Sequence, residues 1–281
     1  MKVLPFKIPK PENAALVYQE ERLPILYDQL HQHGEIQISF IEQGAGTLLV
    51  GDTINDYKPN DILILGSYLP HVFRTDVNFS DLTVMHTLFF DKKSFGNHFF
   101  DLPDLESLNE FFEESEYGIK ILTKKEGIIK AFKRLRNQNK VQKAATLLKI
   151  LDLISKANRK ALSSFVYKKK YTDDEGKRMN DVYNYAMEKY YEPITLEEVA
   201  EVANMSKNAF CRYFKKRTNK TFFQFLIEIR IENACKFIYE QPDASISNIS
   251  EQCGFQNTAN FNRKFKEIKG VTPSHYRLQR F

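Results

Sequence analysis

The sequence has no run approaching the about 18 consecutive apolar residues that a membrane-spanning helix needs. Its opening segment, MKVLPFKIPKPENAA, lacks the apolar core of a secretion signal, so we expect a cytoplasmic protein with no membrane partner. Cysteine is scarce: Cys211, Cys235 and Cys253 are widely spaced, and no two of them form a CxxC pair. This scarcity excludes both a disulfide framework and a zinc ribbon.

Recognisable catalytic motifs are missing as well. No Ser/His/Asp or Cys/His nucleophile set, phosphate-binding loop or paired-carboxylate site stands out. We therefore expect a protein that is not an enzyme, and we assign it no cofactor and no metal. With 42% hydrophobic and 27% charged residues, the 281-residue chain is predicted to be folded and to contain more than one domain.

Charge is distributed unevenly along the chain. Residues 1–100 contain 8 Lys and Arg against 12 Asp and Glu, whereas residues 179–281 contain 15 against 12. An acidic front and a basic rear indicate different partners for the two ends. The net charge of +5 is weak support for nucleic-acid binding by itself, so the positions of the basic residues matter more.

Residues 1–100 are patterned as short strands. Ile36, Ile38 and Phe40 alternate with polar residues, which is the period of a strand with two different faces. Similar short apolar segments lie at 47–50, 62–65, 72–74 and 82–90, separated by turn residues. Several short strands at this spacing predict a small antiparallel barrel or sandwich.

Residues 101–166 change to helical spacing. A stripe of four apolar residues at helical intervals consists of Leu147, Ile150, Leu151 and Ile154. We expect this stripe, within residues 141–162, to form a homodimer contact; the alternative is that it packs wholly onto its own barrel. Residues 167–178, YKKKYTDDEGKR, are polar without an apolar period and predict a linker.

Residues 179–281 predict a separate all-helical domain. Thr195 and Glu198 have the spacing of a capping box, so a short helix should begin at Leu196. Ser206 is the expected N-cap of a second helix that starts at Lys207. Two short helices joined by a tight turn are typical of a helix-turn-helix motif. Residues 206–220 contain six basic residues and no acid: Lys207, Arg212, Lys215, Lys216, Arg217 and Lys220. Such a surface attracts phosphate.

The same pattern occurs a second time. Ser245 begins a helix that ends near Gly254, and a further helix runs from about Asn257. Residues 222–239 predict one long helix between the two motifs. A stiff connector of this kind would let two recognition helices enter successive major-groove segments on one face of DNA, about 34 Å apart.

The rear of the chain thus resembles the DNA-binding domain of the AraC/XylS family of bacterial transcription regulators. The matching segments are TLEEVAEVANMSKNAFCRYFKKRTNKTFFQFLIEIRIENACKFI and ISNISEQCGFQNTANFNRKFKEIKGVTPSHYR. The resemblance implies double-stranded DNA as the partner and RNA polymerase as a further candidate partner. By family position, the base-reading side chains would be Lys207, Asn208, Cys211 and Arg212, then Asn257, Thr258, Asn260 and Arg263. Lys215 and Lys264 are added as further contacts with DNA, and Cys211 could equally be a small filler of the helix surface.

The front of the chain resembles the cupin-like barrel with which many members of this family sense a small molecule. The resemblance is carried by HQHGE at 31–35, GAG at 44–46, PND at 59–61 and PH at 70–71. The implied ligand-binding side chains are His31, His33, Gln37 and His71. On a strand, His31, His33, Glu35 and Gln37 would share one face, and such a polar lining would suit a sugar or another hydroxylated molecule.

Two other uses of this polar face are open. If it points outward, Ile36, Ile38 and Phe40 form the core and the histidines are solvated. Alternatively, His31, His33, Glu35 and His71 are acceptable metal ligands, although Glu35 lies closer to the second histidine than the acid of catalytic cupins does. His86 is expected to be a core histidine with its hydrogen bonds satisfied.

The sequence therefore predicts a multidomain α+β protein with an N-terminal cupin-like barrel, a helical connector and a C-terminal domain of two helix-turn-helix motifs. The leading hypothesis is a transcription regulator controlled by a small-molecule effector. A metal-dependent cupin enzyme fused to a DNA-binding domain is the alternative. A purely structural helical bundle does not account for the basic recognition helices.

Overall fold

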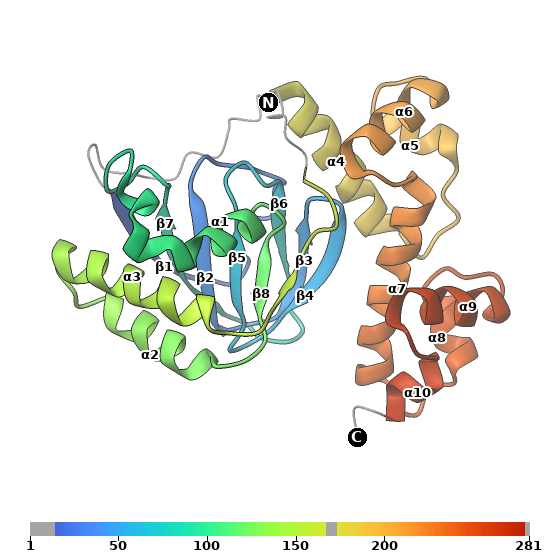
Figure 1. The fold of residues 1–281 in the computed structure, drawn as a ribbon. Helices are drawn as coiled ribbons and strands as arrows, with labels where there is room; N and C mark the ends of the chain where they lie inside the picture. Colours follow the sequence, from blue (N-terminus) through green and yellow to red (C-terminus); the bar gives the residue numbers. More distant parts are fainter. Residues whose placement is uncertain (1–14, 167–172, 279–281) are drawn as a thin grey trace. The chain divides into compact units, whose positions relative to one another are not determined.

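The structure is a computed structural model that describes residues 15–166 and 173–278 (Figure 1). The chain divides into two compact units, residues 1–173 and residues 174–281. The first unit is rich in strands, and the described part of the second unit consists of helices and their connections. This confirms the predicted pairing of a strand-rich N-terminal domain with a helical C-terminal domain. No described helix combines the length and the apolarity that a membrane span requires.

The strands of the first unit form two antiparallel sheets (Figure 1). They are β1 (Leu16–Leu23), β2 (Ile36–Gln43), β3 (Gly46–Val50), β4 (Thr53–Tyr57), β5 (Ile62–Leu65), β6 (His71–Thr75), β7 (Thr83–Phe90), β8 (Ile119–Ile121) and β9 (Arg159–Ala161). The larger sheet has the order β1-β7-β2-β5-β8-β9, and the smaller has the order β4-β3-β6. Strands β2, β3, β5, β6 and β7 lie where the alternating pattern predicted them.

Both faces of the larger sheet are buried at its strands β2, β5 and β7. Ile36, Ile38 and Phe40 of β2 face one core, whereas Ile41 faces a second core between the two sheets. Because side chains alternate along a strand, Gln37 and Ser39 share the inner face with Ile41. Polar groups of β2 are thereby placed inside the protein.

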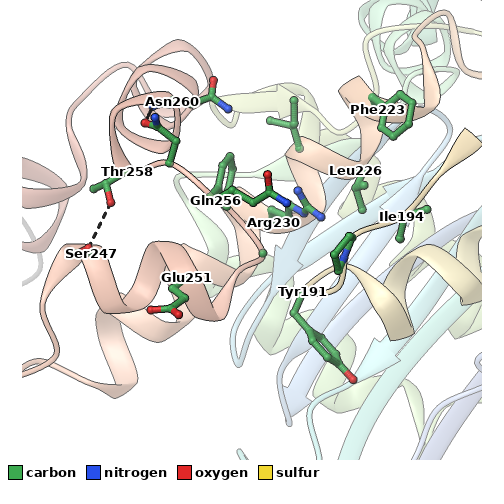
Figure 2. A pocket seen from close by; sticks show the side chains of 15 residues that line it. Tyr191, Ile194, Phe223, Leu226, Arg230, Ser247, Glu251, Gln256, Thr258 and Asn260 are labelled. Carbon is green, nitrogen blue, oxygen red and sulfur yellow. Dashed lines mark hydrogen bonds between the residues drawn. The ribbon is translucent and has the colours of Figure 1, made fainter.

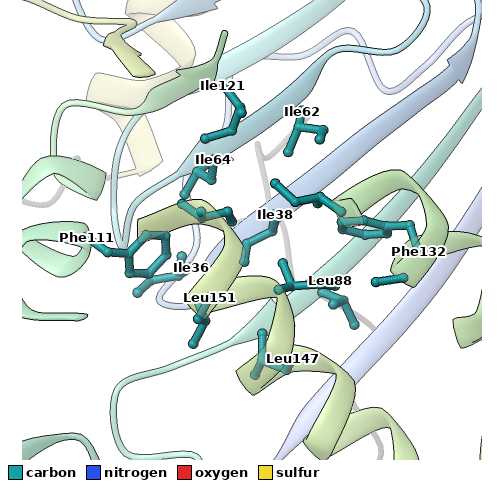
Figure 3. Packing of buried hydrophobic residues seen from close by; sticks show 14 of the residues in the cluster. Ile36, Ile38, Ile62, Ile64, Leu88, Phe111, Ile121, Phe132, Leu147 and Leu151 are labelled. Carbon is teal, nitrogen blue, oxygen red and sulfur yellow. The ribbon is translucent and has the colours of Figure 1, made fainter. Parts of the chain in front are cut away.

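The outer face of the larger sheet is covered by helical segments. These are η1 (Phe99–Asp101), η2 (Pro103–Leu108), α1 (Asn109–Ser115), α2 (Lys125–Leu135) and α3 (Lys140–Ser155). In Figure 3, Leu147 and Leu151 of α3 lie among the strand residues of this core. All four residues of the apolar stripe are completely buried there. The prediction that this stripe forms a dimer contact is therefore wrong, and the alternative, packing onto its own domain, is correct.

Residues 101–166 are not purely helical. β8 pairs with β5 and β9 pairs with β8, so this region completes the larger sheet. η1 and η2 are 3₁₀ segments, although the spacing from Leu102 to Phe112 favours an α-helix. The strand-built domain therefore extends well beyond residue 100, since two three-residue strands of the connector belong to it.

The end of the first unit is tied to the turn between β3 and β4. The buried Asp52 carboxylate accepts hydrogen bonds from the Ser163 hydroxyl, at 2.7 Å, and from the Ser164 main-chain N–H, at 3.0 Å. A Cβ at Gly51 would lie 2.6 Å from the Ser163 hydroxyl oxygen, so only glycine fits beside it. Residues 162–165 are thus fixed to this turn.

The linker was predicted to span residues 167–178, but its second half is helical. Residues 167–172 lie outside the described residues, but the remainder forms the first turns of helix α4 (Asp173–Lys189). Charge clusters without an apolar period therefore do not exclude a helix here.

The second unit contains seven helices in its described part. They are α4, α5 (Leu196–Val202), α6 (Lys207–Thr218), α7 (Phe222–Glu240), α8 (Ile246–Gln252), α9 (Thr258–Lys269) and α10 (Pro273–Leu278). α5 and α6 form the first helix-turn-helix motif, α8 and α9 form the second, and the 19-residue α7 connects them (Figure 1). Both motifs and the long connector confirm the prediction from the sequence.

Local capping signals explain where these helices begin. Thr195 forms the predicted capping box with Glu198, and Ser245 accepts from the Asn248 N–H at 3.1 Å. Thr221 and Gln224 form another capping box at the start of α7. Ser206 has the extended backbone of an N-cap, but its side chain makes no capping hydrogen bond in the described structure.

Each motif has its own aromatic core. Phe210 and Phe214 of α6 pack on Phe222 and Phe225 of α7. The ring centroids of these contacting pairs are 5.6–5.8 Å apart. In the second motif, Phe261 and Phe265 of α9 belong to a core that also includes Ile231 to Ile238 of α7. α7 is therefore shared by both cores and holds the two motifs together.

Candidate DNA interface and candidate sensor site

The predicted DNA-contacting residues of the first motif lie on one exposed face of α6. They are Lys207, Asn208, Cys211, Arg212 and Lys215, all exposed. The opposite face is held in the core by Phe210 and Phe214, so a turn of the helix about its axis is prevented. α6 thus presents a row of amide, guanidinium and ammonium donors, the groups that bind phosphates and base edges.

The basic surface of α6 is narrower than the sequence predicts. Arg217 is buried, where its guanidinium pairs with Glu175 and lies 5.5 Å from the centre of the Tyr213 ring. Lys220 pairs with Glu228 at 2.9 Å. These two cations stabilise the domain itself, and the count of basic residues overestimates those that face outward.

The N-terminus of α9 contains three of the predicted base-reading residues. The Asn257 side chain caps the helix, since its Oδ1 accepts from the Ala259 N–H at 2.8 Å and the Asn260 N–H at 3.1 Å. The Thr258 hydroxyl lies 3.2 Å from the Ser247 hydroxyl of α8. Asn257 therefore has a structural role in addition to any contact with DNA.

Further along α9, Arg263 and Lys264 share one acidic partner. Arg263 donates to Glu267 at 2.7 Å and to Asn260 at 2.9 Å. The Lys264 ammonium lies 2.6 Å from the other oxygen of Glu267. Arg263 is exposed and Asn260 is exposed beside it, so both can reach a duplex once Glu267 releases the guanidinium.

Arg230 of α7, which sequence reasoning missed, connects the two motifs. Its guanidinium donates to the main-chain oxygens of Tyr190, at 2.7 Å, and Glu192, at 2.9 Å, and it lies 5.8 Å from the centre of the Phe255 ring. Close by, a Cβ at Gly254 would lie only 2.8 Å from the Tyr190 oxygen. The turn of the second motif thus packs directly against the segment before the first.

A groove of about 710 Å³ lies between α7, the second motif and the segment before α5 (Figure 2). Its walls include Phe223 and Arg230 of α7, and Figure 2 shows Thr258 and Asn260 of the second motif at its edge. Because predicted DNA-contacting residues line it, the groove belongs to the candidate DNA interface. Phe223 is 42% exposed here. The sequence pattern of α7 did not indicate that this phenylalanine would be exposed.

In the first unit, the structure brings together three of the four predicted ligand-binding residues. His31, His33 and His71 each place one ring nitrogen within 4.8 Å of the others. The ring centres of His31 and His71 are 4.2 Å apart, and those of His33 and His71 are 5.1 Å apart. His31 and His71 also face each other across an isolated β-bridge, which fixes the two main chains at this point.

All three imidazoles are oriented by main-chain carbonyls. The Nδ1 atoms of His31, His33 and His71 lie 2.8–2.9 Å from the oxygens of Gln29, Glu35 and Leu69, respectively. Since a carbonyl only accepts, each Nδ1 carries the proton and each Nε2 is left as the basic nitrogen. Burial lowers the pKa of His31 to about 4, and burial also lowers the pKa of His33 and, by more, that of His71. The cluster is therefore neutral near pH 7.

Gln37, the fourth predicted residue, extends this site into the protein. Gln37 is buried. One end of its side-chain amide lies 3.1 Å from the His33 Nε2, and the other end forms a hydrogen bond of 2.9 Å with the Ser39 hydroxyl. Ser39 in turn lies 2.9 Å from the Thr87 hydroxyl. Because the neutral His33 Nε2 accepts, we assign the amide nitrogen of Gln37 to the His33 side, so that its oxygen accepts from Ser39. Ser39 and Thr87 were not predicted, although Ser39 lies on the same strand face as Gln37.

The alternative in which the histidines are solvated is wrong, because His33 and His71 are buried. Its other half is correct, since Ile36, Ile38 and Phe40 do form a core. Residues 31–35 precede the strand, so both sets of side chains can be buried. Glu35, considered as a metal ligand, has a carboxylate oxygen 4.0 Å from the His33 Nδ1, the nitrogen that already faces a carbonyl.

His86 has both of its ring nitrogens in hydrogen bonds. Nδ1 lies 2.8 Å from the Tyr18 hydroxyl, and Nε2 lies 2.7 Å from the Glu42 carboxylate. Burial raises the pKa of Tyr18 to about 12, with a further contribution from Glu20. His86 is thus a satisfied core histidine, as predicted.

Two family models match the chain. A helix-turn-helix domain matches residues 199–279, and an AraC-like ligand binding domain matches residues 13–85. The first match covers both motifs from α5 onward, and the second covers β1 to β6 with all three clustered histidines. The candidate DNA interface and the candidate sensor site therefore lie in separate matched domains.

Curated relatives match over about 100 residues. The uncharacterized HTH-type transcriptional regulator YdeC of Bacillus subtilis is 33% identical over 100 residues, which are 36% of this chain and 34% of that protein. The MmsAB operon regulatory protein of Pseudomonas aeruginosa is 28% identical over 99 residues, 35% of this chain and 32% of that protein. The matched part of the chain spans about a third of the length of these relatives.

Solved structures match as well. A crystal structure of the DNA-binding domain of AdpA in complex with a target DNA is 30% identical, covers 35% of this chain and 87% of that chain, and has a TM-score of 0.33. The crystal structure of ToxT from Vibrio cholerae is 14% identical, covers 94% of this chain and 97% of that chain, and has a TM-score of 0.38.

Proposed function

Because the chain carries the AraC-type helix-turn-helix domain and the AraC-like ligand-binding domain of a family of transcription regulators, we propose that it binds specific DNA sites under the control of a small molecule. The observation that carries this proposal is the exposed row of donors on each of two recognition helices. Both helices are fixed to one connector, α7, so they can address two segments of a duplex together.

In the proposed interface, the side chains divide by chemistry. Arg212 of α6 and Arg263 of α9 are long, exposed side chains whose guanidinium groups can form bidentate hydrogen bonds with guanine edges. Lys215 is exposed one turn beyond Arg212 and is suited to a phosphate. Asn208 and Asn260 provide amides, which pair with adenine.

Arg212→Ala and Arg263→Ala should each weaken binding to the specific site by about 1 to 3 kcal/mol, because a base contact is lost. Lys215→Ala should weaken all sequences alike and should reduce the slope of log K against log salt by about 1, because one phosphate contact is lost. The measurement is a fluorescence-anisotropy titration of specific and random duplexes at several salt concentrations. Equal losses on both duplexes for the two arginine variants would contradict base reading.

We propose that the effector binds beside the histidine cluster of the first unit. The support is a buried polar chain from His33 through Gln37 and Ser39 to Thr87, on the inner face of the larger sheet beside the apolar core between the two sheets. Hydroxyl and amide groups of this kind bind hydroxylated molecules such as sugars. The effector would act by favouring one arrangement of the DNA-binding units.

A sugar that binds here should raise the free energy of unfolding by about 2.7 kcal/mol at a hundredfold excess over its Kd. Gln37→Leu should remove this stabilisation and leave DNA affinity without sugar unchanged, because α6 and α9 lie in the other unit. Thermal unfolding of the full chain with a panel of sugars measures it. Linkage adds a check: operator DNA must change the sugar affinity by the same factor by which the sugar changes DNA affinity. A Gln37→Leu protein that responds like wild type would place the effector elsewhere.

Four further expectations belong to this proposal. We propose that the protein acts as a homodimer through the outward face of α3, where Val141 is 78% exposed, since the buried stripe is not accessible. We propose a cytoplasmic location, which suits a DNA-binding role, and keep RNA polymerase as a candidate partner. We also propose that the chain acts by binding rather than by catalysis, because the comparisons favour a regulator over a cupin enzyme.

A further inference from the structure

We propose that His31, His33 and His71 together bind one divalent transition-metal ion, with Zn²⁺ as the ion of choice for testing. One nitrogen of each residue lies within 4.8 Å of the other two. In a tetrahedral site with Zn–N bonds of about 2.0–2.1 Å, ligand nitrogens are about 3.4 Å apart. The rings therefore need to approach one another by about 1.4 Å at most, a shift that rotations of side chains can provide.

The hydrogen bonds of the cluster favour this use. Each imidazole donates its Nδ1 proton to a main-chain carbonyl, at 2.8 or 2.9 Å. Histidines that bind metals are held in the same way, because the outer hydrogen bond fixes the tautomer and makes the other nitrogen a better ligand. The three carbonyls come from Gln29, Glu35 and Leu69, so the orientation is set independently for each ring.

His71 provides a second, independent observation. Its side chain is completely buried, and its Nε2 has no hydrogen-bond partner among the described residues. A buried polar atom without a partner is rare, because it has lost its contact with water without a replacement. The ring centres of His31 and His33 lie 4.2 and 5.1 Å from the ring centre of His71. A metal ion between the three rings would satisfy this nitrogen.

The protonation state of the site agrees with this role. A histidine binds a metal only when it is neutral. Since the Nδ1 proton of each ring goes to a main-chain carbonyl, the Nε2 of each neutral ring is the basic nitrogen that a metal can bind. For the His33 Nε2 to bind a metal, the side-chain amide of Gln37 would have to give up its hydrogen bond with that nitrogen. Its hydrogen bond with the Ser39 hydroxyl could remain.

The chemistry of the ligands also selects the ion. Three neutral imidazoles suit zinc, copper, nickel or iron, whereas magnesium and calcium prefer oxygen ligands. A fourth position would be left for water or for another ligand. This proposal does not depend on the proposed effector, because metal binding can be measured without any small molecule or DNA.

The experiment uses the full chain after chelation and gel filtration. Zn²⁺ is titrated by calorimetry, and Co²⁺ is titrated by visible absorption, whose intensity reports a four-coordinate site. We expect one ion per chain and a higher unfolding temperature with Zn²⁺. Loss of an outer hydrogen bond lowers metal affinity by up to about 100-fold, and loss of a ligand lowers it further. His71→Ala should therefore bind Zn²⁺ more than about 100-fold more weakly. His31→Asn, at a partly exposed position, gives a second test with less risk of misfolding.

The matched control is His98→Ala, since the side chain of His98 is 89% exposed and lies in the same unit. This variant should bind like wild type. Cys211→Ser should also bind like wild type, which separates the site from the exposed thiol. The proposal is overturned if wild type binds no stoichiometric Zn²⁺, or if the folded His31→Asn variant, checked by circular dichroism, binds as tightly as wild type.

Discussion

Replacing Leu151 with Glu should unfold the first unit. Leu151 is completely buried in the core between α3 and the larger sheet (Figure 3). Removing a buried leucine side chain costs about 2 to 5 kcal/mol, and a buried unpaired carboxylate adds several more. The sum is comparable to the whole stability of a domain, about 5 to 15 kcal/mol. Circular dichroism and limited proteolysis of the full chain would measure the loss.

Val141→Glu is the matched control, because it introduces the same charge into the same helix at a position that is 78% exposed. This variant should remain folded, with a change in stability within about 0.5 kcal/mol. Sedimentation then tests whether the outward face of α3 forms the proposed dimer contact. A soluble, folded Leu151→Glu protein would contradict the packing described here.

The metal-free protein should lose stability as the pH falls from 7.5 to 5.5. Burial holds the pKa values of His31, His33 and His71 below the ordinary value of 6.5. Below pH 6.5 the unfolded chain therefore binds more protons than the folded chain, and acid favours unfolding. Each histidine can contribute up to about 1.4 kcal/mol per pH unit, and for His31 this continues down to about pH 4. Above pH 6.5 the contribution is constant.

Hydrogen exchange of the β2 and β7 amides in the full chain would measure this loss in the first unit alone. His71→Gln should show a shallower dependence on pH, because one titrating group is gone. His98→Ala should follow wild type, since that side chain is 89% exposed. Protection that stays constant down to pH 5.5 would show that the histidines become protonated without unfolding, in a more open site than the structure has.

The helical domain was predictable because its signals are local. The capping box at Thr195, the cap at Ser245 and the glycine at Gly254 mark helix ends within a few residues. Strands β8 and β9 were missed because three residues are too few to show a period. They exist because β5 offers them a partner, which no local pattern records.

The sequence showed which residues share a face of a helix more readily than it showed what that face contacts. Helical spacing correctly identified the apolar stripe with Leu147 and Leu151, but it cannot show whether that stripe meets its own sheet or another chain. The same limit applies to Asn257, since an asparagine before a helix is suited both to capping and to binding DNA. The three histidines were selected together, but their shared orientation depends on carbonyls of Gln29 and Leu69 that carry no side-chain signal.

The pairing of Glu267 with Arg263 and Lys264 has a consequence for selectivity. This carboxylate pairs with both cations, at 2.7 and 2.6 Å. If Arg263 and Lys264 contact DNA as proposed, a duplex must displace this acid of the protein itself before it gains either cation. A poorly fitting sequence would not replace both lost ion pairs, whereas a well-fitting one would. On that proposal, Glu267 would act as a built-in competitor that weakens indiscriminate attachment to DNA more than it weakens attachment at the correct site.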